Sequence, residues 1–303
     1  MIYTITFSPS IDYVINTKNK FNSNDLNRVE DYELVPGGKG INASIVLKRI
    51  GFDNKAISFL GGKTENLFLE LMSDEKIELI NFASENDTRI NVKMFAQDSS
   101  FEINGARAKI AQEEYEKLLN FIDQLSKDDF VLIMGICEES FLKKLVEKIH
   151  QKGINFALDI DSKIILDLIK YNPFIIKPNR SELESLLNIK INDLEDIKNA
   201  MKQLKSFGLK NLIVSDGGRG SYFIGEDNKI LQITLKKKFD IISTVGAGDT
   251  LISSFAITYL KTKNIIESLK IATSLSIGTS CTRFLASKED MNKYQEFIEI
   301  KEI

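Results

Sequence analysis

The 303-residue sequence contains no tryptophan, one histidine, two cysteines and only four prolines. Two cysteines in a chain of this length, Cys137 and Cys281, do not make a disulfide framework, and no C-x-x-C motif is present. A single histidine excludes a His-rich metal site, and it argues against a Ser-His-Asp hydrolase unless His150 is the base. We interpret His150 as a structural residue near the end of an amphipathic helix, where a cation is favourable.

The sequence also lacks an excess of either charge and lacks a long apolar run. Lysine and arginine together number 40 and aspartate and glutamate 43, so the formal net charge is −3. Such a chain is a poor candidate for binding nucleic acid or an anionic membrane through a broad basic surface. No apolar run has the length of a membrane span, and no basic, apolar leader precedes the first strand-like run. We therefore expect a soluble, cytoplasmic protein.

The middle of the chain alternates short apolar runs with amphipathic helical patterns such as 141–149 and 164–169. The apolar runs cover 131–134, 156–158, 174–176 and 212–214. Continuous apolar runs between helices are typical of parallel strands that are buried on both faces. We predict a doubly wound α/β fold that forms one domain over 1–303, with ligands bound at the carboxyl ends of the strands.

Two pairs of strand-like segments in the N-terminal third have no helix between them, so they do not continue a parallel sheet. These pairs are 11–16 with 28–35, and 89–95 with 101–104. We predict that they form a small β layer, a lid of about 11–36 and 88–105 inserted into the α/β body. Such a layer can serve as a cover for an active site or as a dimer surface.

The strongest local signal is the segment STVGAGDT at 243–250, which directly precedes an apolar helical pattern. Gly246 and Gly248 permit close approach of a ligand, and the free N–H groups of a helix start favour an anion. Beside a bound phosphate, Asp249 is a candidate general base for an attacking hydroxyl group. The alternative is that Asp249 or Thr250 is only an N-cap and that the glycines only form a tight turn.

A second glycine cluster, PGGKGIN at 36–42, also opens a helical pattern. Three glycines remove side chains so that a ligand can lie against the backbone, while Lys39 and Asn42 supply charge and hydrogen bonds. The spacing is not that of a P-loop, and the absence of G-x-G-x-x-G argues against a nicotinamide or flavin dehydrogenase. The alternative is a glycine-rich loop with a solvated lysine.

Two further segments each allow two interpretations. The run IVSDGGRG at 213–220 is compatible with a hairpin or, at the end of a parallel strand, with a nucleotide contact. Asn179 and Glu182 stand three residues apart at a strand-to-helix junction, so they share one face of the first helical turn. The same spacing is that of a capping box, which alone is the favoured interpretation.

Arg89, Asn91 and Lys93 alternate along one predicted strand and therefore share a face. Two cations and an amide on one face suit a phosphorylated sugar, although an ordinary solvated face fits the pattern equally well.

Taken together and in this order, the motifs resemble the ribokinase-like, PfkB-type family of sugar kinases, and the resemblance covers nearly the whole chain. The motifs on which the resemblance rests are SPSID at 8–12, GGKGIN at 37–42, KPNRSE at 177–182 and GAGD at 246–249. TRINVK at 88–93 and EING at 102–105 are most similar to the branch that acts on phosphorylated ketohexoses. Within it the 1-phosphofructokinases are the nearest, followed by tagatose-6-phosphate kinases and the minor type of 6-phosphofructokinase.

The resemblance implies transfer of the γ-phosphoryl group of ATP, with Mg²⁺, to a primary sugar hydroxyl. In 1-phosphofructokinases the acceptor is fructose 1-phosphate and the product is fructose 1,6-bisphosphate. The implied catalytic residues are Asp249 as the base and Gly246, Ala247 and Gly248 as the anion hole. The implied sugar ligands are Asp12, Gly37, Gly38, Asn42 and Asn91, and the candidates for the substrate phosphate are Arg28, Lys39 and Arg89. The implied nucleotide ligands are Lys177, Asn179, Ser215, Asp216, Gly217, Gly218 and Gly220, and those for Mg²⁺, through water, are Asn179 and Glu182.

Two other functions remain open at this point. A kinase of an unphosphorylated sugar or nucleoside is disfavoured, because the candidate sites carry more cations than a neutral acceptor needs. A nucleotide- or sugar-binding regulator without turnover is the alternative from another class. The resemblance also implies a homodimer through the β layer, whose exposed edge is expected to be paired or covered.

Overall fold

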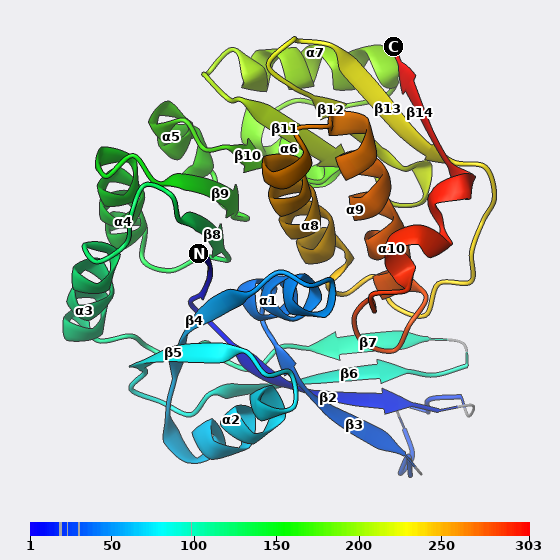
Figure 1. The fold of residues 1–303 in the computed structure, drawn as a ribbon. Helices are drawn as coiled ribbons and strands as arrows, with labels where there is room; N and C mark the ends of the chain where they lie inside the picture. The colour runs from blue at the N-terminus through cyan, green and yellow to red at the C-terminus, as the bar shows by residue number, and fades with distance from the viewer. Residues whose placement is uncertain (18–19, 23, 30, 98) are drawn as a thin grey trace.

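The computed structural model describes residues 1–17, 20–22, 24–29, 31–97 and 99–303. A ten-stranded sheet of order β14-β13-β12-β11-β10-β9-β8-β1-β4-β5 forms its body (Figure 1). The strands of this sheet are β1 (Ile2–Thr6), β4 (Asn54–Leu60), β5 (Glu78–Ala83), β8 (Phe130–Met134), β9 (Asn155–Asp159), β10 (Ile175–Ile176), β11 (Asn211–Ser215), β12 (Ser221–Ile224), β13 (Ile230–Leu235) and β14 (Ile298–Glu302).

In this sheet β5, β4, β1, β8, β9, β10 and β11 are parallel to one another, while β12, β13 and β14 add an antiparallel edge. The central strands are apolar at consecutive positions because both of their faces are covered; all five residues of β8 are buried. The predicted doubly wound, mostly parallel α/β body is therefore confirmed. All the parallel strands end at one edge, and this edge carries the candidate site.

Helices cover both faces of the body. The chain has α1 (Lys39–Arg49), α2 (Glu65–Ser73), α3 (Gln112–Ile122), α4 (Glu139–Gln151), α5 (Ile165–Leu168), α6 (Arg180–Leu187), α7 (Leu194–Lys205), α8 (Ala247–Thr262), α9 (Ile265–Ser280) and α10 (Asp290–Lys293). One apolar cluster includes side chains of α3, α4, α6 and α7, and a second, on the opposite face, includes side chains of α1, α8 and α9. No helix among the described residues is both long and apolar enough to cross a bilayer.

A separate four-stranded sheet of order β3-β2-β6-β7 lies apart from the body, below it in the view of Figure 1. Its strands are β2 (Ser10–Asn16), β3 (Tyr32–Gly37), β6 (Arg89–Phe95) and β7 (Ser100–Ile103). The two predicted antiparallel pairs are present as β2 with β3 and β6 with β7, and a parallel pairing of β2 with β6 joins them. Strand β3 begins at Tyr32, so the predicted strand 28–35 began too early. We call this sheet the lid.

Three local expectations need correction or refinement. The helical pattern at 164–169 gives only the four-residue α5 followed by a short 3-10 helix, Ile169–Tyr171. The run at 174–176 supplies only two ladder residues, those of β10. The segment after β11 is a hairpin, because β11 and β12 pair antiparallel across the 3-10 turn Gly217–Arg219. This hairpin still begins at the end of a parallel strand, so the two interpretations of the segment are compatible.

Candidate active site

The start of α8 is a bare helix end with its backbone open to a ligand. Gly246 precedes the first helical residue with φ +78°, a left-handed conformation that glycine adopts without strain. A Cβ at Gly248 would lie 3.0 Å from Lys177 Nζ, so the absence of a side chain there lets an ammonium group approach the helix start. The free N–H groups of the first turn and this cation together favour a negatively charged ligand.

Asp249 occupies the first turn of α8 and is buried, with 7% of its surface exposed. Asn42 Nδ2 of α1 donates a hydrogen bond of 2.8 Å to Asp249 Oδ2, which connects the two glycine-opened helices. Burial and the nearby charge of Asp159 raise the pKa of Asp249 to about 6, while Lys39, Asn42 and Lys177 act in the opposite direction. A carboxylate with this pKa is suited to accept a proton near neutral pH.

A second buried carboxylate, Asp159, ends β9 near Asp249. Lys39 Nζ lies 3.2 Å from Asp159 Oδ1, and Lys177 Nζ lies 3.9 Å from Asp159 Oδ2. Burial acts to lower the pKa of Lys39, but the charges of Asp159, Asp249 and Glu182 outweigh it and raise this pKa. The site therefore contains two carboxylates and two ammonium groups around the start of α8.

The lid contributes a third buried carboxylate, Asp12, which is fully partnered. Ser10 Oγ and Asn91 Nδ2 each donate a hydrogen bond of 2.8 Å to Asp12 Oδ1, and Lys93 forms an ion pair with Oδ2. A Cβ at Gly37 would lie 2.6 Å from Asp12 Oδ2, so a glycine is required on the neighbouring strand. Because Asp12, Asn91 and Lys93 share one face of the lid, this face is polar and charged toward the body.

A small cavity of about 20 Å³ lies between the lid and the body, enough for about one water molecule. Its lining includes Asp12, Asn42 and Lys93 as well as residues that follow the body's later strands and helices: Ser243, Val245, Arg283, Phe284 and Leu285. Arg283 Nη1 donates to Glu33 Oε1 of β3 at 3.1 Å, which ties the segment after α9 to the lid. Of the predicted sugar ligands, Asp12 and Asn42 line this space.

The three predicted phosphate ligands do not all lie in the same place. Lys39 pairs with Asp159 in the body, whereas Arg89 begins β6 and donates through Nη2 to Ser8 O at 3.2 Å. Burial and the neighbouring Arg107 lower the pKa of Arg89, so two cations lie close together there. The exposed Arg28 lies in the loop before β3, outside the described lining of the cavity.

The predicted nucleotide segment begins where β11 ends. Ser215 forms an isolated parallel bridge with Asn179, which brings 177–182 and 215–220 together at the same edge of the sheet. Gly217 and Gly220 have φ of +56° and +98°, so the turn depends on them. Asp216 pairs with Arg180 and with Arg219; burial acts to raise the pKa of Asp216, but these cations lower it.

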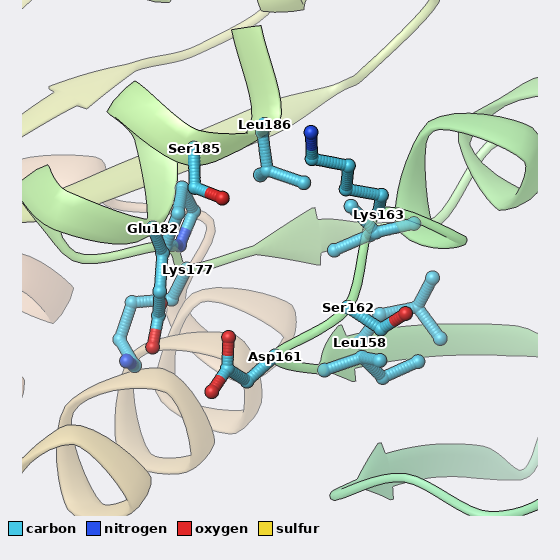
Figure 2. A pocket seen from close by; sticks show the side chains of 11 residues that line it. Leu158, Asp161, Ser162, Lys163, Lys177, Glu182, Ser185 and Leu186 are labelled. Atoms are coloured by element: carbon cyan, nitrogen blue, oxygen red, sulfur yellow. The ribbon is translucent and has the colours of Figure 1, made fainter. Parts of the chain in front are cut away.

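Asn179 and Glu182 form the capping box of α6. Asn179 Oδ1 accepts from the Glu182 N–H at 2.9 Å, and Glu182 Oε2 accepts from the Asn179 N–H at 2.8 Å. Lys177, Glu182 and Asp161 line one pocket, which has a volume of about 50 Å³ (Figure 2). The described residues contain no cluster of three or more acidic, histidine or cysteine side chains that would hold a metal unaided. The carboxylates in the lining of this pocket are those of Asp161 and Glu182, and Mg²⁺ needs few protein carboxylates when water and phosphate oxygens complete its shell.

The fold brings the predicted residues into two neighbouring groups. The lid group contains Asp12, Gly37 and Asn91, and the body group contains Lys39, Asn42, Lys177 and Gly246–Asp249. Asp159 also belongs to the body group, although it lies in none of the motifs that predicted the site. A signal was available, because Asp159 directly follows the apolar run 156–158 at the end of a predicted parallel strand, where ligands bind.

Comparison with known proteins identifies relatives over the full chain. A family model described as "pfkB family carbohydrate kinase" matches residues 5–283. A 1-phosphofructokinase of Borreliella burgdorferi is 31% identical over 100% of this chain and 99% of the relative. A D-tagatose-1-phosphate kinase of Bacillus licheniformis is 28% identical over 98% of this chain and 97% of the relative. The crystal structure of phosphofructokinase-2 from Escherichia coli in complex with substrates and products has a TM-score of 0.90 at 23% identity, covering 98% of both chains.

Proposed function

Because the chain belongs to the pfkB family of carbohydrate kinases and is therefore an ATP-using enzyme, we propose that it phosphorylates a ketohexose phosphate. The favoured reaction is ATP plus fructose 1-phosphate giving ADP and fructose 1,6-bisphosphate. The observation that supports it best is Asp249, a buried carboxylate with a pKa of about 6, at a bare helix start beside the side chains of Lys39 and Lys177. ATP as a substrate is consistent with a cytoplasmic location.

In the proposed reaction Asp249 accepts the proton of the attacking sugar hydroxyl while the hydroxyl oxygen bonds to the γ-phosphorus. The bond from the γ-phosphorus to the bridging oxygen breaks, and ADP leaves. Asn42 holds the Asp249 carboxylate through the 2.8 Å hydrogen bond to Oδ2. The backbone of Gly246, Ala247 and Gly248 faces the transferring phosphoryl oxygens. The Ala247 N–H already donates a hydrogen bond of 3.3 Å to Thr244 O. The N–H groups of Gly246 and Gly248 are therefore more available to the phosphoryl oxygens. Phosphoryl transfer needs mainly such positioning and charge stabilisation.

On the sugar side, Asp12, Asn42 and Asn91 with the backbone of Gly37 and Gly38 would hold the hydroxyl groups. The charge of Asp12 is balanced by Lys93, so this carboxylate acts as a fixed hydrogen-bond acceptor. Arg89 is the best-placed candidate for the phosphate that the substrate already carries, with Lys39 and Arg28 as further candidates. Arg89 is supported by its place on β6, on the same face of the lid as Asn91 and the cavity residue Lys93.

On the nucleotide side, Lys177 and Asn179 would contact the ATP phosphates, and Ser215–Gly220 would line the nucleotide site. Asp216 would act through Arg180 and Arg219, because both of its oxygens are occupied by these cations. Asn179 and Glu182 would hold Mg²⁺ through water, since the capping box leaves Glu182 Oε1 available. The ion would neutralise charge on the phosphates of ATP.

The proposal is tested by ADP release over a panel of fructose and tagatose phosphates, phosphorylated at either end, together with unphosphorylated fructose and ribose. We expect fructose 1-phosphate to give the highest kcat/KM and removal of Mg²⁺ to abolish turnover. Preference for a tagatose phosphate or fructose 6-phosphate would reassign the substrate within the family, because epimers differ in one hydroxyl contact. ATP binding with no turnover of any sugar would favour a regulator and refute the enzyme.

We also propose that the enzyme is a homodimer in which the lids of two copies meet. Tyr32, Ile90, Phe101 and Ile103 are exposed, and the strand registers put all four on the lid face opposite Asp12 and Lys93. An exposed apolar face of this kind is expected to be covered by a partner. Sedimentation should give a dimer for the wild type and a monomer for Ile103→Glu, and a wild-type monomer would refute the proposal.

A further inference from the structure

Asp159 is a buried carboxylate that pairs with lysine side chains. It ends β9, is 3% exposed, and faces two lysines that come from distant parts of the chain. Lys39 reaches it from the start of α1, and Lys177 from the segment after β10. Asp159 Oδ2 has no hydrogen-bond partner among the described residues, so the carboxylate is held by charge attraction more than by a closed hydrogen-bond network.

The same two lysines also act on the proposed base. Both stabilise the charged form of Asp249, and Lys177 Nζ lies against the backbone of Gly248. Asp159 and Asp249 therefore compete for one pair of cations. In a buried site each of these carboxylates determines how much positive charge remains for the other.

We infer that Asp159 is a positioning residue that holds the ammonium groups of Lys39 and Lys177 and limits how far they neutralise Asp249. The inference rests on the proposed role of Asp249 as the base. It assigns a function to a residue that touches neither substrate in the proposed reaction, because Asp159 acts through the two lysines. It also explains why a carboxylate without a complete set of hydrogen bonds is buried beside the site.

The charged and titratable groups around Asp249 give this inference a direction. Asp159 of β9 disfavours the ionised form of Asp249, whereas Lys39 of α1 and Lys177 after β10 favour it. The charge of Glu182 of α6 acts to raise the pKa of Lys39. Removing the Asp159 charge should therefore lower the pKa of Asp249, and removing the Lys39 charge should raise it.

The test compares Asp159→Asn with Lys39→Gln in the full-length enzyme, using the pH dependence of kcat/KM, which reports groups of the free enzyme. We expect the acid limb of Asp159→Asn to move to lower pH by about one unit, and that of Lys39→Gln to move to higher pH by a similar amount. At the pH optimum, kcat/KM of Asp159→Asn should fall about tenfold or more, because the ammonium groups of Lys39 and Lys177 are no longer held in position.

Asp167→Asn is the matched control, since Asp167 of α5 makes only an exposed pair with Lys143 at 2.7 Å. Its acid limb should coincide with that of the wild type. If Asp159→Asn does not fold, the double variant Asp159→Asn/Lys39→Gln removes both charges of the 3.2 Å pair. Its acid limb should return to within a few tenths of a unit of the wild-type position, and a large displacement in either direction would overturn the inference.

The outcomes separate this inference from the proposed function. Unchanged acid limbs in Asp159→Asn and Lys39→Gln, or shifts in the same direction, overturn the role of Asp159 while an inactive Asp249→Asn still supports the base. Near-normal turnover of Asp249→Asn removes the base and the inference together. Opposite shifts in the two variants, with Asp167→Asn unchanged, support both.

Discussion

Asp12 and Asp249 are both buried aspartates of the proposed active site, but their surroundings differ. Asp12 has a hydrogen bond to Ser10, another to Asn91 and an ion pair with Lys93, all within the lid. Among the described residues, the Asp249 carboxylate accepts one hydrogen bond, from Asn42, and it shares its cations with Asp159. The protein itself satisfies the first carboxylate, which makes it a fixed ligand. It leaves the second incompletely stabilised, which makes it able to take up a proton.

The largest effect should come from replacing the incompletely stabilised carboxylate. Asp249→Asn should lower kcat by about 10²- to 10⁴-fold, because a general base contributes a factor of this size. The fold and the affinity for ATP should persist, since the amide can still accept the hydrogen bond from Asn42. Steady-state kinetics and calorimetric ATP titration measure both, and near-normal kcat would show that another group is the base.

Replacing the satisfied carboxylate should affect binding more than chemistry. Asp12→Asn should raise KM for the sugar phosphate by about 10- to 100-fold, the value of a lost charge-assisted hydrogen bond. KM for ATP should stay close to that of the wild type, because Asp12 lies on the lid face of the cavity. A loss confined to kcat, with KM unchanged, would contradict this division between the two aspartates.

The pH profile tests the same contrast without a mutation at either aspartate. Asp249 must be ionised to accept a proton, so kcat/KM should be half its maximum near pH 6 and fall about tenfold per unit below that. In Asp12→Asn this acid limb should keep its position. A limb near pH 4 in the wild type would mean that Asp249 does not have the raised pKa that its burial gives it.

The smallest effect concerns stability, and it should have opposite signs at the two positions. The pKa of Asp249 rises from 3.8 to about 6 on folding, so its ionisation lowers the free energy of unfolding as pH rises through this window. At pH 7, Asp249→Asn should raise Tm by a few degrees. Asp12→Asn leaves Lys93 buried without its counter-charge and should lower Tm by about 5–10 °C. Scanning calorimetry distinguishes these signs, and equal shifts would contradict them.

Much of the body was predictable because its strands are buried on both faces and the intervening helices are amphipathic. The apolar run at β8 and the glycine clusters before α1 and α8 are local patterns, and the structure has the expected element at each. The short α5 was not predictable from its apolar spacing, since the chain leaves the helix after four residues. Tertiary packing decides such lengths.

The candidate site was predictable only where its residues lie in recognisable local motifs. Asp159 and Lys39 are 120 positions apart, and nothing local to either residue indicates that they pair. The relation of Asn179 to Glu182 shows a different limit. Their spacing correctly indicated a capping box, but spacing alone does not say whether Glu182 Oε1 also serves a ligand.

The cavity between the lid and the body has a consequence for the rate of the reaction. The enclosed space of about 20 Å³ holds about one water molecule, which is too little for a sugar phosphate. We therefore expect the lid to move away from the body when the substrate binds, which would break the contact between Arg283 and Glu33. Turnover should then slow in viscous solvent, and the enzyme's speed would be set by hinge motion as well as by the chemistry of proton and phosphoryl transfer.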